Sequence, residues 1–497
     1  MASLRRSGIG VALGALAAFG QAPYDQPVLL VAAFAFAVFV YHDCTNPRQA
    51  AFFGWAFGLG YFAHALQWIV SPFMVDVARH GWMAPFALLF LSAGLALFWG
   101  MAFYLARRFD PLRAWPLILC LPAVELLRAY IFTGFPWAMP AQAMINVAGG
   151  QALAWIGPYV LNLVIVAVAV GLALRGLTAA ERILRYCALL LALGSALLPP
   201  MAPEAALTGQ SIRLIQPNAA QRDKWDPDQI PVFFARQLKL TAAAPEAGKT
   251  PPDLVLWSET AIPWVLDRAE PALVQIAQAG GGAPVALGVQ RRDDMQYYNS
   301  MVVLDAAGGV MQTYDKHHLV PFGEYMPFAD LMARIGVFGL ADRALGGYAS
   351  GPGPQVLDFG PLGRALPLIC YEAVFAHDVN AAPERPEFLI QLTNDAWFGK
   401  AAGPRQHLAQ AQMRAIEQGL PLARAANTGV SAMIDPYGRV AAALPLNTSG
   451  FLDAALPAPL PPTLYSRTGD LPFAVVLLLG LVFMATMRLR AERNLSD

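Results

Sequence analysis

A cysteine, a glutamate and a lysine with the side chains for acyl-transfer chemistry lie near strand-like runs in the polar middle of the chain. Cys370 follows the apolar run 366–369, Glu259 follows the apolar run 254–257, and Lys316 comes shortly after Tyr314. Cys370 is the only cysteine in this polar stretch. A thiol becomes a nucleophile when a base removes its proton, and a nearby cation assists. The three residues therefore predict a nucleophilic cysteine with its own base and cation.

Each side chain has a definite role in such a reaction. A carboxylate held partly out of water, as we expect for Glu259, has a raised pKa and becomes a useful general base. A fixed ammonium at Lys316 favours the thiolate and also stabilises a tetrahedral oxyanion. The backbone N–H of Tyr371, next to the nucleophile Cys370, is a natural second donor to that oxyanion. Together these groups describe acyl transfer through a thioester.

Each residue also has an ordinary structural interpretation. Cys370 alone is compatible with a small buried hydrophobic residue. Glu259 alone is compatible with a turn cap, and Lys316 alone with an ion pair to Asp315. The ordered set of three is far more specific than any one member, and it decides between the two interpretations.

The composition is that of a membrane protein. The chain has 497 residues, of which 57% are hydrophobic and 14% are charged, whereas soluble domains have roughly 25% charged residues. The net charge is zero, which gives no support for nucleic-acid binding. The four cysteines suggest no disulfide framework.

Apolar segments occupy both ends of the chain and predict about eight transmembrane helices. Several are shorter than the roughly 20 residues that cross a bilayer. The first resembles a signal peptide, but further apolar segments follow at once and favour a retained helix. The segments are 7–22, 27–41, 51–70, 84–106, 115–132, 148–174, 183–199 and 471–487.

Basic residues in the loops predict the orientation. Positive residues favour the cytoplasm, and they gather before the first segment, in alternate loops and after the last segment. Both termini are then cytoplasmic, and the stretch between the seventh and eighth helices is extracytoplasmic. We therefore expect a seven-helix region at 1–204, a catalytic domain at 205–465, and a last helix with a cytoplasmic tail at 466–497.

Strand-like and helix-like runs alternate in the region 205–465, which is typical of a layered α/β domain. A helix is predicted at 406–425, with a break at 419–421. The proline-rich stretch 457–462 is a linker into the last helix. The predicted strands are 211–216, 254–257, 285–290, 300–305, 366–372 and 388–393.

These residues resemble a known family. The ordered Glu259, Lys316 and Cys370 are similar to the Glu-Lys-Cys triad of the nitrilase superfamily, whose members fold as an α-β-β-α sandwich. With seven apolar helices before and one after, the chain resembles bacterial apolipoprotein N-acyltransferases over almost its whole length. The motifs that carry this resemblance are Ala22-Pro-Tyr-Asp25, Gln216-Pro-Asn218, Lys224-Trp-Asp226, Pro321-Phe-Gly-Glu-Tyr325, Cys370-Tyr-Glu372 and Thr393-Asn-Asp-Ala-Trp-Phe-Gly399.

The resemblance implies an activity. Such an enzyme takes an acyl chain from a phospholipid, typically phosphatidylethanolamine, and holds it as a thioester on the cysteine. It then passes the chain to the α-amine of an S-diacylglyceryl cysteine at an apolipoprotein N-terminus, with ping-pong kinetics. The implied location is the bacterial inner membrane with a periplasmic catalytic domain. No cofactor is implied, and a monomer needs no special feature.

The resemblance also implies supporting residues. Glu324 would support the base and the oxyanion site, Tyr371 and Glu372 would shape the pocket around the thiol, and Trp225 would lie in a substrate-facing loop. Loops at 322–328, 335–348 and 397–404 are candidates for lids at the membrane surface. The alternative interpretation is that these loops pack against the core of the domain.

Two ionisable clusters have mainly structural interpretations. Adjacent His317 and His318 do not present both rings to one metal from a regular strand, because side chains alternate. The sequence therefore predicts no metal site. Glu125 and Arg128 form a structural pair three residues apart in the fifth helix or, less simply, a head-group site.

Two other functions remain open from the sequence. One is a membrane-tethered amidase or nitrilase acting on a small C–N substrate, although a single helix would suffice as its tether. The other is a transporter or lipid-binding protein with a decayed catalytic domain. The intact Glu259, Lys316 and Cys370 weigh against the second.

Overall fold

The computed structural model describes residues 2–175, 178–329, 334 and 347–494, which fall into two compact units. The helical unit comprises Met1–Ala202, Ala401–Ala409 and Pro462–Asp497, and the sheet unit comprises Pro203–Lys400 and Gln410–Pro461. The sequence did not indicate that 401–409 would group with the helices. Each unit is described by itself below.

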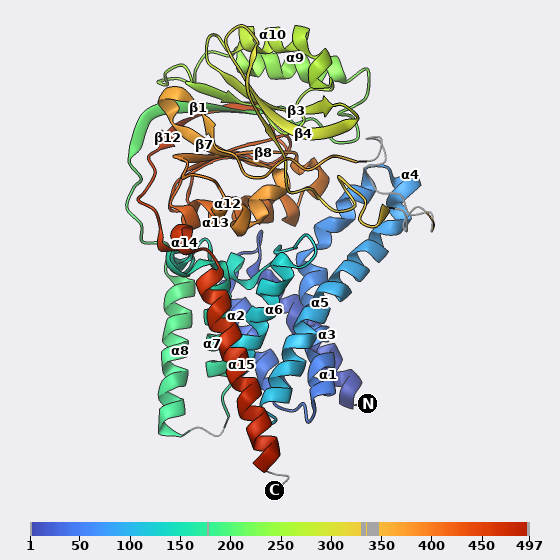
Figure 1. The fold of residues 1–497 in the computed structure, drawn as a ribbon, viewed down its shortest axis with the longest axis vertical. Helices are drawn as coiled ribbons and strands as arrows, with labels where there is room; N and C mark the ends of the chain where they lie inside the picture. The colour runs from blue at the N-terminus through green and yellow to red at the C-terminus, as the bar shows by residue number, and fades with distance from the viewer. Residues whose placement is uncertain (1, 176–177, 330–333, 335–346, 495–497) are drawn as a thin grey trace. The chain divides into compact units, whose positions relative to one another are not determined.

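Within its described residues, the helical unit has a helix on each of the eight predicted apolar segments (Figure 1). Among the residues that the structure describes, three helical stretches are long and apolar enough to cross a membrane: Val77–Phe109, Ala148–Leu172 and Leu471–Asn494. The other helices are shorter or less apolar, so the number of membrane spans stays a prediction. The eight helices are α1 (Ala2–Ala17), α2 (Pro27–Tyr41), α3 (Pro47–Ala65), α5 (Ala84–Phe109), α6 (Leu117–Tyr130), α7 (Leu153–Leu172), α8 (Ala179–Leu197) and α15 (Leu471–Asn494).

Glycines allow α1 and α3 to pack closely. A Cβ atom on Gly14 would lie 1.9 Å from the Phe57 carbonyl oxygen, and one on Gly60 would lie 2.0 Å from that of Val11. Small residues of this kind bring helix backbones together in a lipid environment, where packing drives association. The outward side of α15 is instead covered with large exposed apolar residues, among them Leu478, Leu479, Val482 and Phe483.

The charged pair of α6 makes the internal contacts that the structural interpretation predicts. Glu125 and Arg128 are buried, with 2.6 Å between Arg128 Nη2 and Glu125 Oε2. Trp99 Nε1 donates to the same carboxylate at 2.9 Å, and Arg128 donates to the Trp137 carbonyl at 2.9 Å. These bonds tie α6 to α5 and to the segment that follows α6, and they account for both charges.

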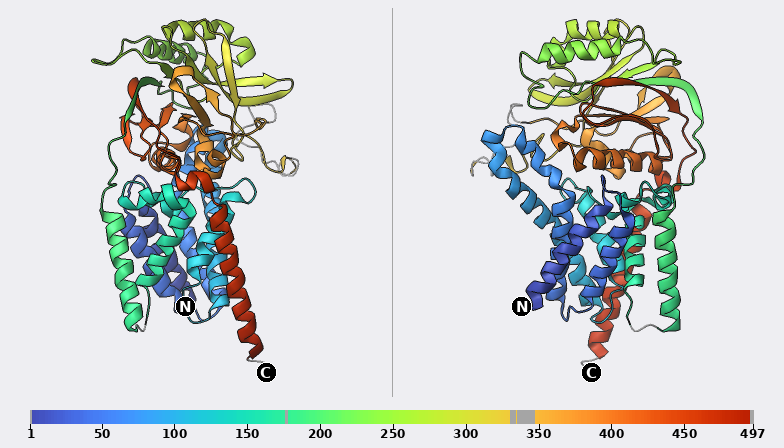
Figure 2. Two further views of the ribbon diagram at one scale, coloured as in Figure 1. Left: turned by 60° about the vertical axis from the view of Figure 1, so that its left-hand side comes forward. Right: turned by 180° about the vertical axis from the view of Figure 1, so that it is seen from behind.

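The sheet unit is an α-β-β-α sandwich, as the resemblance to the nitrilase superfamily implied. Two six-stranded sheets have the orders β12-β1-β2-β3-β4-β5 and β11-β10-β9-β8-β7-β6. Helices α9 (Ile230–Thr241) and α10 (Glu270–Ala279) cover the outer face of the first sheet, and α12 (Ala376–Asn380) and α13 (Ala402–Gln418) lie on the outer side of the second (Figures 1 and 2). The strands of the first sheet are β1 (Leu207–Gln216), β2 (Leu254–Leu256), β3 (Val285–Asp293), β4 (Gln296–Leu304), β5 (Val310–Asp315) and β12 (Gly450–Pro457), and those of the second are β6 (Leu357–Asp358), β7 (Arg364–Ile369), β8 (Phe388–Thr393), β9 (Leu422–Ala426), β10 (Ser431–Ile434) and β11 (Val440–Leu444).

All six predicted strands are present, but the strand predicted at 366–372 ends at Ile369 and is followed by a 3₁₀ helix, Cys370–Val374. The predicted break at 419–421 in the helix 406–425 is confirmed, whereas the helix predicted beyond that break is wrong. Helix α13 stops at Gln418, Gly419 adopts φ 63°, and the chain returns as strand β9, which pairs in parallel with β8. The run Leu422–Ala426 lacks β-branched residues, so its strand conformation comes from sheet pairing and full burial rather than from local preference.

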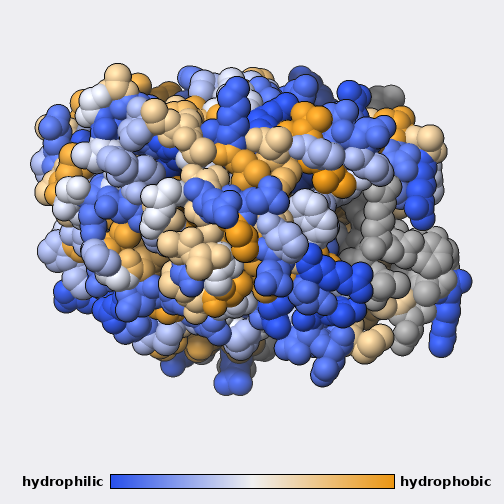
Figure 3. Space-filling model, turned by 90° about the horizontal axis from the view of Figure 1, so that it is seen from above, coloured by the Kyte–Doolittle hydropathy of each residue, from blue (hydrophilic) through white to orange (hydrophobic). Residues whose placement is uncertain are grey.

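The core between the sheets explains why most residues of the central strands are apolar. Residues such as Leu214, Leu256, Met301, Ile369 and Ile390 are buried there in one cluster. Strands β7, β8 and β9 run parallel and are covered on both faces, which requires continuous rather than alternating hydrophobicity. On the outer face that carries α9 and α10, hydrophobic side chains are scattered among hydrophilic ones (Figure 3).

A buried ion pair joins the first and last strands of the sheet unit, and it yields a stability prediction. Arg213 of β1 meets Asp453 of β12 through two bonds of 2.7 and 2.8 Å, and both side chains are at most 1% exposed. Replacing one partner leaves a buried charge uncompensated. We expect Asp453→Asn to lower the free energy of unfolding by about 3–5 kcal/mol, seen as a lower melting temperature of the purified chain in detergent.

The matched control is Asp267→Asn, because Asp267 pairs with Arg292 at 3.1 Å on the surface, where the two side chains are 42% and 41% exposed. An exposed pair contributes less than about 1 kcal/mol. Equal melting temperatures for the two variants would contradict the structural role assigned to Asp453.

Candidate active site

Glu259 lies just beyond β2, where the main chain passes very close to β3. The Ala261 N–H donates to the Gly288 carbonyl at 2.7 Å, and Thr260 adopts φ 46°. A Cβ atom on Gly288 would come within 2.6 Å of the Glu259 Cα and within 2.5 Å of the Thr260 nitrogen. Only glycine fits at this point of β3, so Gly288 sets the place of the Glu259 backbone.

Two amide donors fix the Glu259 carboxylate. Asn299 Nδ2 donates to Oε1 at 2.7 Å, and the Asn394 backbone N–H donates to Oε2 at 2.9 Å. Asn299 belongs to β4 of the first sheet, and Asn394 follows β8 of the second. The carboxylate is therefore held by both sheets at once.

Lys316 follows β5 and lies between two carboxylates. Its Nζ is 2.8 Å from Glu324 Oε2, 2.9 Å from Glu324 Oε1 and 3.8 Å from Glu259 Oε1, and its side chain is fully buried. Asn299 Nδ2 also donates to Glu324, at 3.0 Å, so one amide group bridges Glu259 and Glu324. Glu324 is further held by the Val320 N–H at 2.8 Å.

Cys370 lies at the end of β7 in a backbone conformation that is uncommon for a residue with a side chain. Its φ is 53°, and the residue is 5% exposed. Gln391 Nε2 donates to its carbonyl at 3.1 Å. A left-handed non-glycine residue persists only where its surroundings hold it, and such residues cluster at functional sites.

Glu372 is the main support of the turn that contains Cys370. The side chain is fully buried, and its Oε2 accepts from the Ile369 N–H at 2.6 Å. Its Oε1 accepts from the Tyr314 hydroxyl at 2.8 Å and from the His317 N–H at 2.8 Å. One carboxylate therefore links the turn after β7 to the end of β5, beside Lys316.

The electrostatics of the site follow from burial and from these charges. Burial raises the pKa of Glu259, and Lys316 acts in the opposite direction without cancelling the effect. Burial alone would lower the pKa of Lys316, but the carboxylates of Glu324 and Glu259 raise it. Lys316 is thus a permanent ammonium, and Glu259 is a stronger base than an exposed glutamate.

Burial also raises the pKa of the Cys370 thiol well above its usual range, and the charge of Glu259 adds to this. Lys316 and the Thr393 hydroxyl favour the thiolate but are outweighed. The charge of Lys316 thus acts in the expected direction, toward the thiolate, and burial outweighs it. A neutral thiol needs a base at the moment of attack, and Glu259 is the carboxylate whose charge acts most strongly on the Cys370 thiol.

The structure thus brings Glu259, Lys316, Glu324 and Cys370 into one largely buried cluster, and Glu372 supports the turn that contains Cys370. Sequence reasoning missed Asn299 and Asn394 as partners of the base. Asn299 carried a signal, because it is a polar residue directly before an apolar strand-like run. Asn394 lies in a motif that carried the resemblance, but its N–H contact follows only from the fold.

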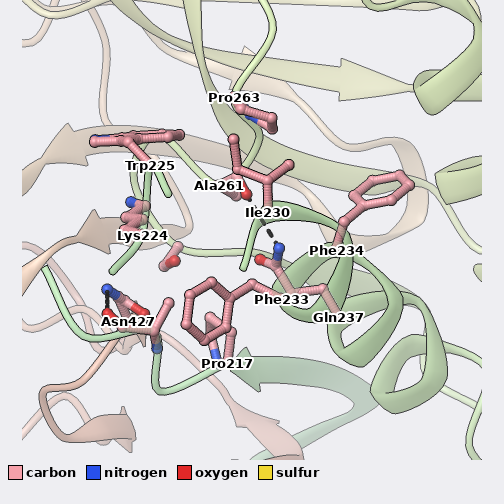
Figure 4. Close-up of a pocket in the computed structure, with 12 residues that line it drawn as sticks. Pro217, Lys224, Trp225, Ile230, Phe233, Phe234, Gln237, Ala261, Pro263 and Asn427 are labelled. Atoms are coloured by element: carbon pink, nitrogen blue, oxygen red, sulfur yellow. Dashed lines mark hydrogen bonds between the residues drawn. The ribbon is translucent and has the colours of Figure 1, made fainter. Parts of the chain in front are cut away.

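Trp225 lies on a pocket beside the base. The pocket is lined mainly by apolar side chains of α9 and the segment before it, with Ser258 and Ala261 from the strand end that carries Glu259 (Figure 4). Lys224, next to Trp225, is buried on the same pocket. The lining residues are Pro217, Ala219, Lys224, Trp225, Ile230, Phe233, Phe234, Gln237, Ser258, Ala261, Pro263 and Asn427.

His318, the second of the two adjacent histidines, forms a group with His377 and Asp378 that the sequence did not indicate. His318 Nδ1 lies 2.7 Å from Asp378 Oδ2, and His377 Nε2 lies 3.5 Å from Asp378 Oδ1. One ligand atom from each of these three residues falls within 4.8 Å of the others, which is close enough to share an ion. Hydrogen bonding and ion pairing within the group also account for the approach. The expectation that the chain binds no metal stays a prediction.

Only part of the predicted lid loops lies within the residues that the structure describes. Phe322 and Phe328 adopt positive φ values of 63° and 52°, and their side chains are 52% and 73% exposed. Most of the loop 335–348 lies outside the described residues. The segment Asp395–Phe398 is a short 3₁₀ helix whose first residue is buried.

A strained cysteine beside a buried base and ammonium, on a four-layer sandwich, places the chain in the carbon–nitrogen hydrolase class of enzymes. The family model for carbon-nitrogen hydrolases matches residues 212–460. A second family model, the apolipoprotein N-acyltransferase N-terminal domain, matches residues 13–171.

Curated relatives match the chain along nearly its whole length. The apolipoprotein N-acyltransferase of Rhodopseudomonas palustris is 37% identical over 97% of this chain and 95% of its own. Those of Bradyrhizobium diazoefficiens and Sinorhizobium fredii are 37% and 38% identical, over 99% and 92% of this chain and 96% and 91% of their own. Among solved structures, a mutant amidase of the nitrilase superfamily from Nesterenkonia covers 50% of this chain and 92% of its own at 21% identity and a TM-score of 0.37. The chain belongs to the apolipoprotein N-acyltransferase family and is an acyltransferase enzyme.

The support that the buried Glu372 carboxylate gives to the turn at Cys370 can be tested by substitution. In Glu372→Gln one accepting oxygen becomes an NH₂ group that faces backbone or hydroxyl donors, so the turn holding Cys370 shifts. A shift of about 1 Å in a reacting group costs about 100-fold in rate. We expect the acyl-transfer rate of the purified enzyme to fall by at least about tenfold. The matched change Glu384→Gln, at an exposed glutamate 48% accessible, should leave the rate unchanged. Similar rates in both variants would refute the supporting role of Glu372.

Proposed function

We propose that this enzyme transfers a fatty acyl chain from a glycerophospholipid, through a thioester on Cys370, to the N-terminal α-amine of the S-diacylglyceryl cysteine of apolipoproteins. The observation that carries the proposal is the buried cluster in which Lys316 lies between Glu259 and Glu324, next to Cys370. Family membership supplies the acceptor class, because the relatives are named for apolipoproteins. Phosphatidylethanolamine is the proposed donor.

In the first half-reaction, the Glu259 carboxylate takes the proton of the Cys370 thiol as the sulfur attacks the ester carbonyl of the lipid. The resulting oxyanion receives hydrogen bonds from Lys316 Nζ and from the Tyr371 N–H. The tetrahedral intermediate then breaks its bond to the glycerol oxygen, which takes the proton from Glu259. The products are a lysophospholipid and the acyl-cysteine thioester, and Glu259 is a carboxylate again.

In the second half-reaction, the acceptor α-amine attacks the thioester carbonyl. The amine must be neutral to attack, and Glu259 takes the proton that it loses as the C–N bond forms. The C–S bond breaks, and the sulfur of Cys370 receives the proton back from Glu259. The enzyme returns to its starting state, which gives ping-pong kinetics.

The proposed setting is the bacterial inner membrane. Residues 1–204 would form a seven-helix membrane region, 205–465 a periplasmic catalytic domain, and 466–497 a last membrane helix with a cytoplasmic tail. Support comes from the loop charges and from the apolar helices, of which α15 exposes large hydrophobic side chains. Trp225 would contact substrate from the rim of its pocket, and the enzyme would act as a monomer.

The nucleophile provides the direct test of this proposal. We expect Cys370→Ala to abolish both lysophospholipid release and acceptor acylation, because no thioester forms. The measurement is lysophospholipid release from labelled vesicles, with a synthetic diacylated lipopeptide as acceptor. Cys187→Ala is the matched control, since Cys187 is exposed and lies in α8 of the other unit. Near wild-type turnover in Cys370→Ala would refute the mechanism.

The ammonium of Lys316 provides a second test. Loss of an oxyanion donor costs about 100-fold or more in rate, and we expect this effect on kcat for Lys316→Ala. Lys249→Ala, at an exposed lysine, should have the wild-type rate. A loss below roughly tenfold in Lys316→Ala would remove this residue from the oxyanion role.

A further inference from the structure

Lys224 is a second buried lysine beside the base, and the reaction above does not use it. The residue is 6% exposed, and its Nζ lies 3.3 Å from the main-chain carbonyl oxygen of Glu259, to which it donates. The same Nζ lies 5.0 Å from the centre of the Trp225 ring. Figure 4 shows Lys224 beneath Trp225 on the pocket next to this strand end.

The surroundings of Lys224 do not explain it as an ordinary ion pair. Among the described residues, no carboxylate oxygen forms an ion pair with Lys224 Nζ within 4.0 Å, in contrast to Lys316. Burial lowers its pKa to about 8, and the charge of Glu259 acts against this. A buried ammonium without a contacting carboxylate is costly, and such groups are concentrated at functional sites.

We propose that Lys224 is a positioning residue that holds the main chain of Glu259 and keeps its carboxylate in the ionised form that accepts a proton. The hydrogen bond to the Glu259 carbonyl acts on the backbone that Gly288 holds from the β3 side. The positive charge of Lys224 acts on the carboxylate through space, since it lowers the pKa that burial raises. This inference rests on the proposed function, because it assigns a role to Glu259 as the base.

The carboxylate of Glu259 has several charged or titratable neighbours, and only Lys224 approaches it from the segment before α9. Lys316 and Glu324 are the larger influences, of opposite sign, and both stay in place when Lys224 is changed. The groups that face Glu259 from the packed elements are Lys224 before α9, Lys316 and Glu324 after β5, Tyr348 beside β4, and Cys370 after β7.

Loss of the Lys224 charge changes the reaction rate mainly at low pH. Removing the charge of Lys224 raises the pKa of Glu259, so a larger share of the base is protonated and inactive at low pH. At high pH the carboxylate is ionised with or without Lys224, and Lys224 itself loses its charge above about pH 8. The variant should therefore lose rate mainly on the acid side.

The test measures acyl-enzyme formation by the full-length enzyme in detergent with a labelled phosphatidylethanolamine, from about pH 6 to about pH 9. We expect Lys224→Met to be slower than wild type near pH 6, by up to about tenfold for a shift of one pKa unit, and to approach wild type near pH 9, because the variant lacks a charge that lowers the pKa of Glu259. Lys224→Arg, which keeps the charge, should recover a large part of the rate at low pH. Lys239→Met, at an exposed lysine of α9, is the matched control.

The outcomes separate this inference from the proposed function. A wild-type enzyme that forms no acyl-enzyme would overturn the proposed function itself. A wild type that does so, with a Lys224→Met variant whose relative rate is the same at every pH, would overturn the role of Lys224 alone. Melting temperatures of both Lys224 variants accompany the rates. A pH-dependent loss in a folded Lys224→Met, relieved in Lys224→Arg, supports the inference.

Discussion

The site depends on one buried lysine that is shared by two carboxylates. Lys316 has no access to water, so the charges of Glu259 and Glu324 are what make its ammonium stable. The same ammonium allows two carboxylates to approach each other at the centre of a protein, where they would otherwise repel. The amide of Asn299, which donates to both, fixes their spacing. With Lys224 nearby, the cluster holds two ammonium groups and two carboxylates.

In the proposed mechanism, the balance of charges around Cys370 explains how its neutral thiol acts as the nucleophile. The thiol of Cys370 is neutral at rest because it is buried beside a negative charge. A resting thiolate would react with any electrophile, whereas a thiol that loses its proton to Glu259 only during attack reacts where an ester is correctly placed. The left-handed turn at Cys370, held by Glu372, would keep the sulfur in place through both half-reactions of the proposed mechanism.

The sequence predicted much of this arrangement, and the reasons are physical. Glu259 and Cys370 follow apolar runs that become buried strands, and strand ends of neighbouring sheets meet at one edge of a sandwich. Each of the eight apolar segments carries a helix within the described residues, because long runs of apolar residues favour helices that pack against one another. The roles of Glu324, Tyr371, Glu372 and Trp225 came from resemblance and not from pattern.

Other parts could not be predicted because they depend on distant neighbours. Strand β9 is a run of small residues with no β preference, and only its pairing with β8 makes it a strand. Gly288 is an unremarkable glycine in sequence, yet its missing side chain decides where Glu259 lies. The contact between Lys224 and Glu259 joins residues 35 positions apart. Such contacts follow from register and turn geometry rather than from composition.

The most direct test of the account is the intact mass of the purified enzyme after exposure to phospholipid in the absence of acceptor. The account predicts a mass gain of one fatty acyl group, located on Cys370 by peptide mapping and removed by hydroxylamine, which cleaves thioesters. An unchanged mass in an enzyme that still transfers acyl chains, or an acyl group on another residue, would contradict it.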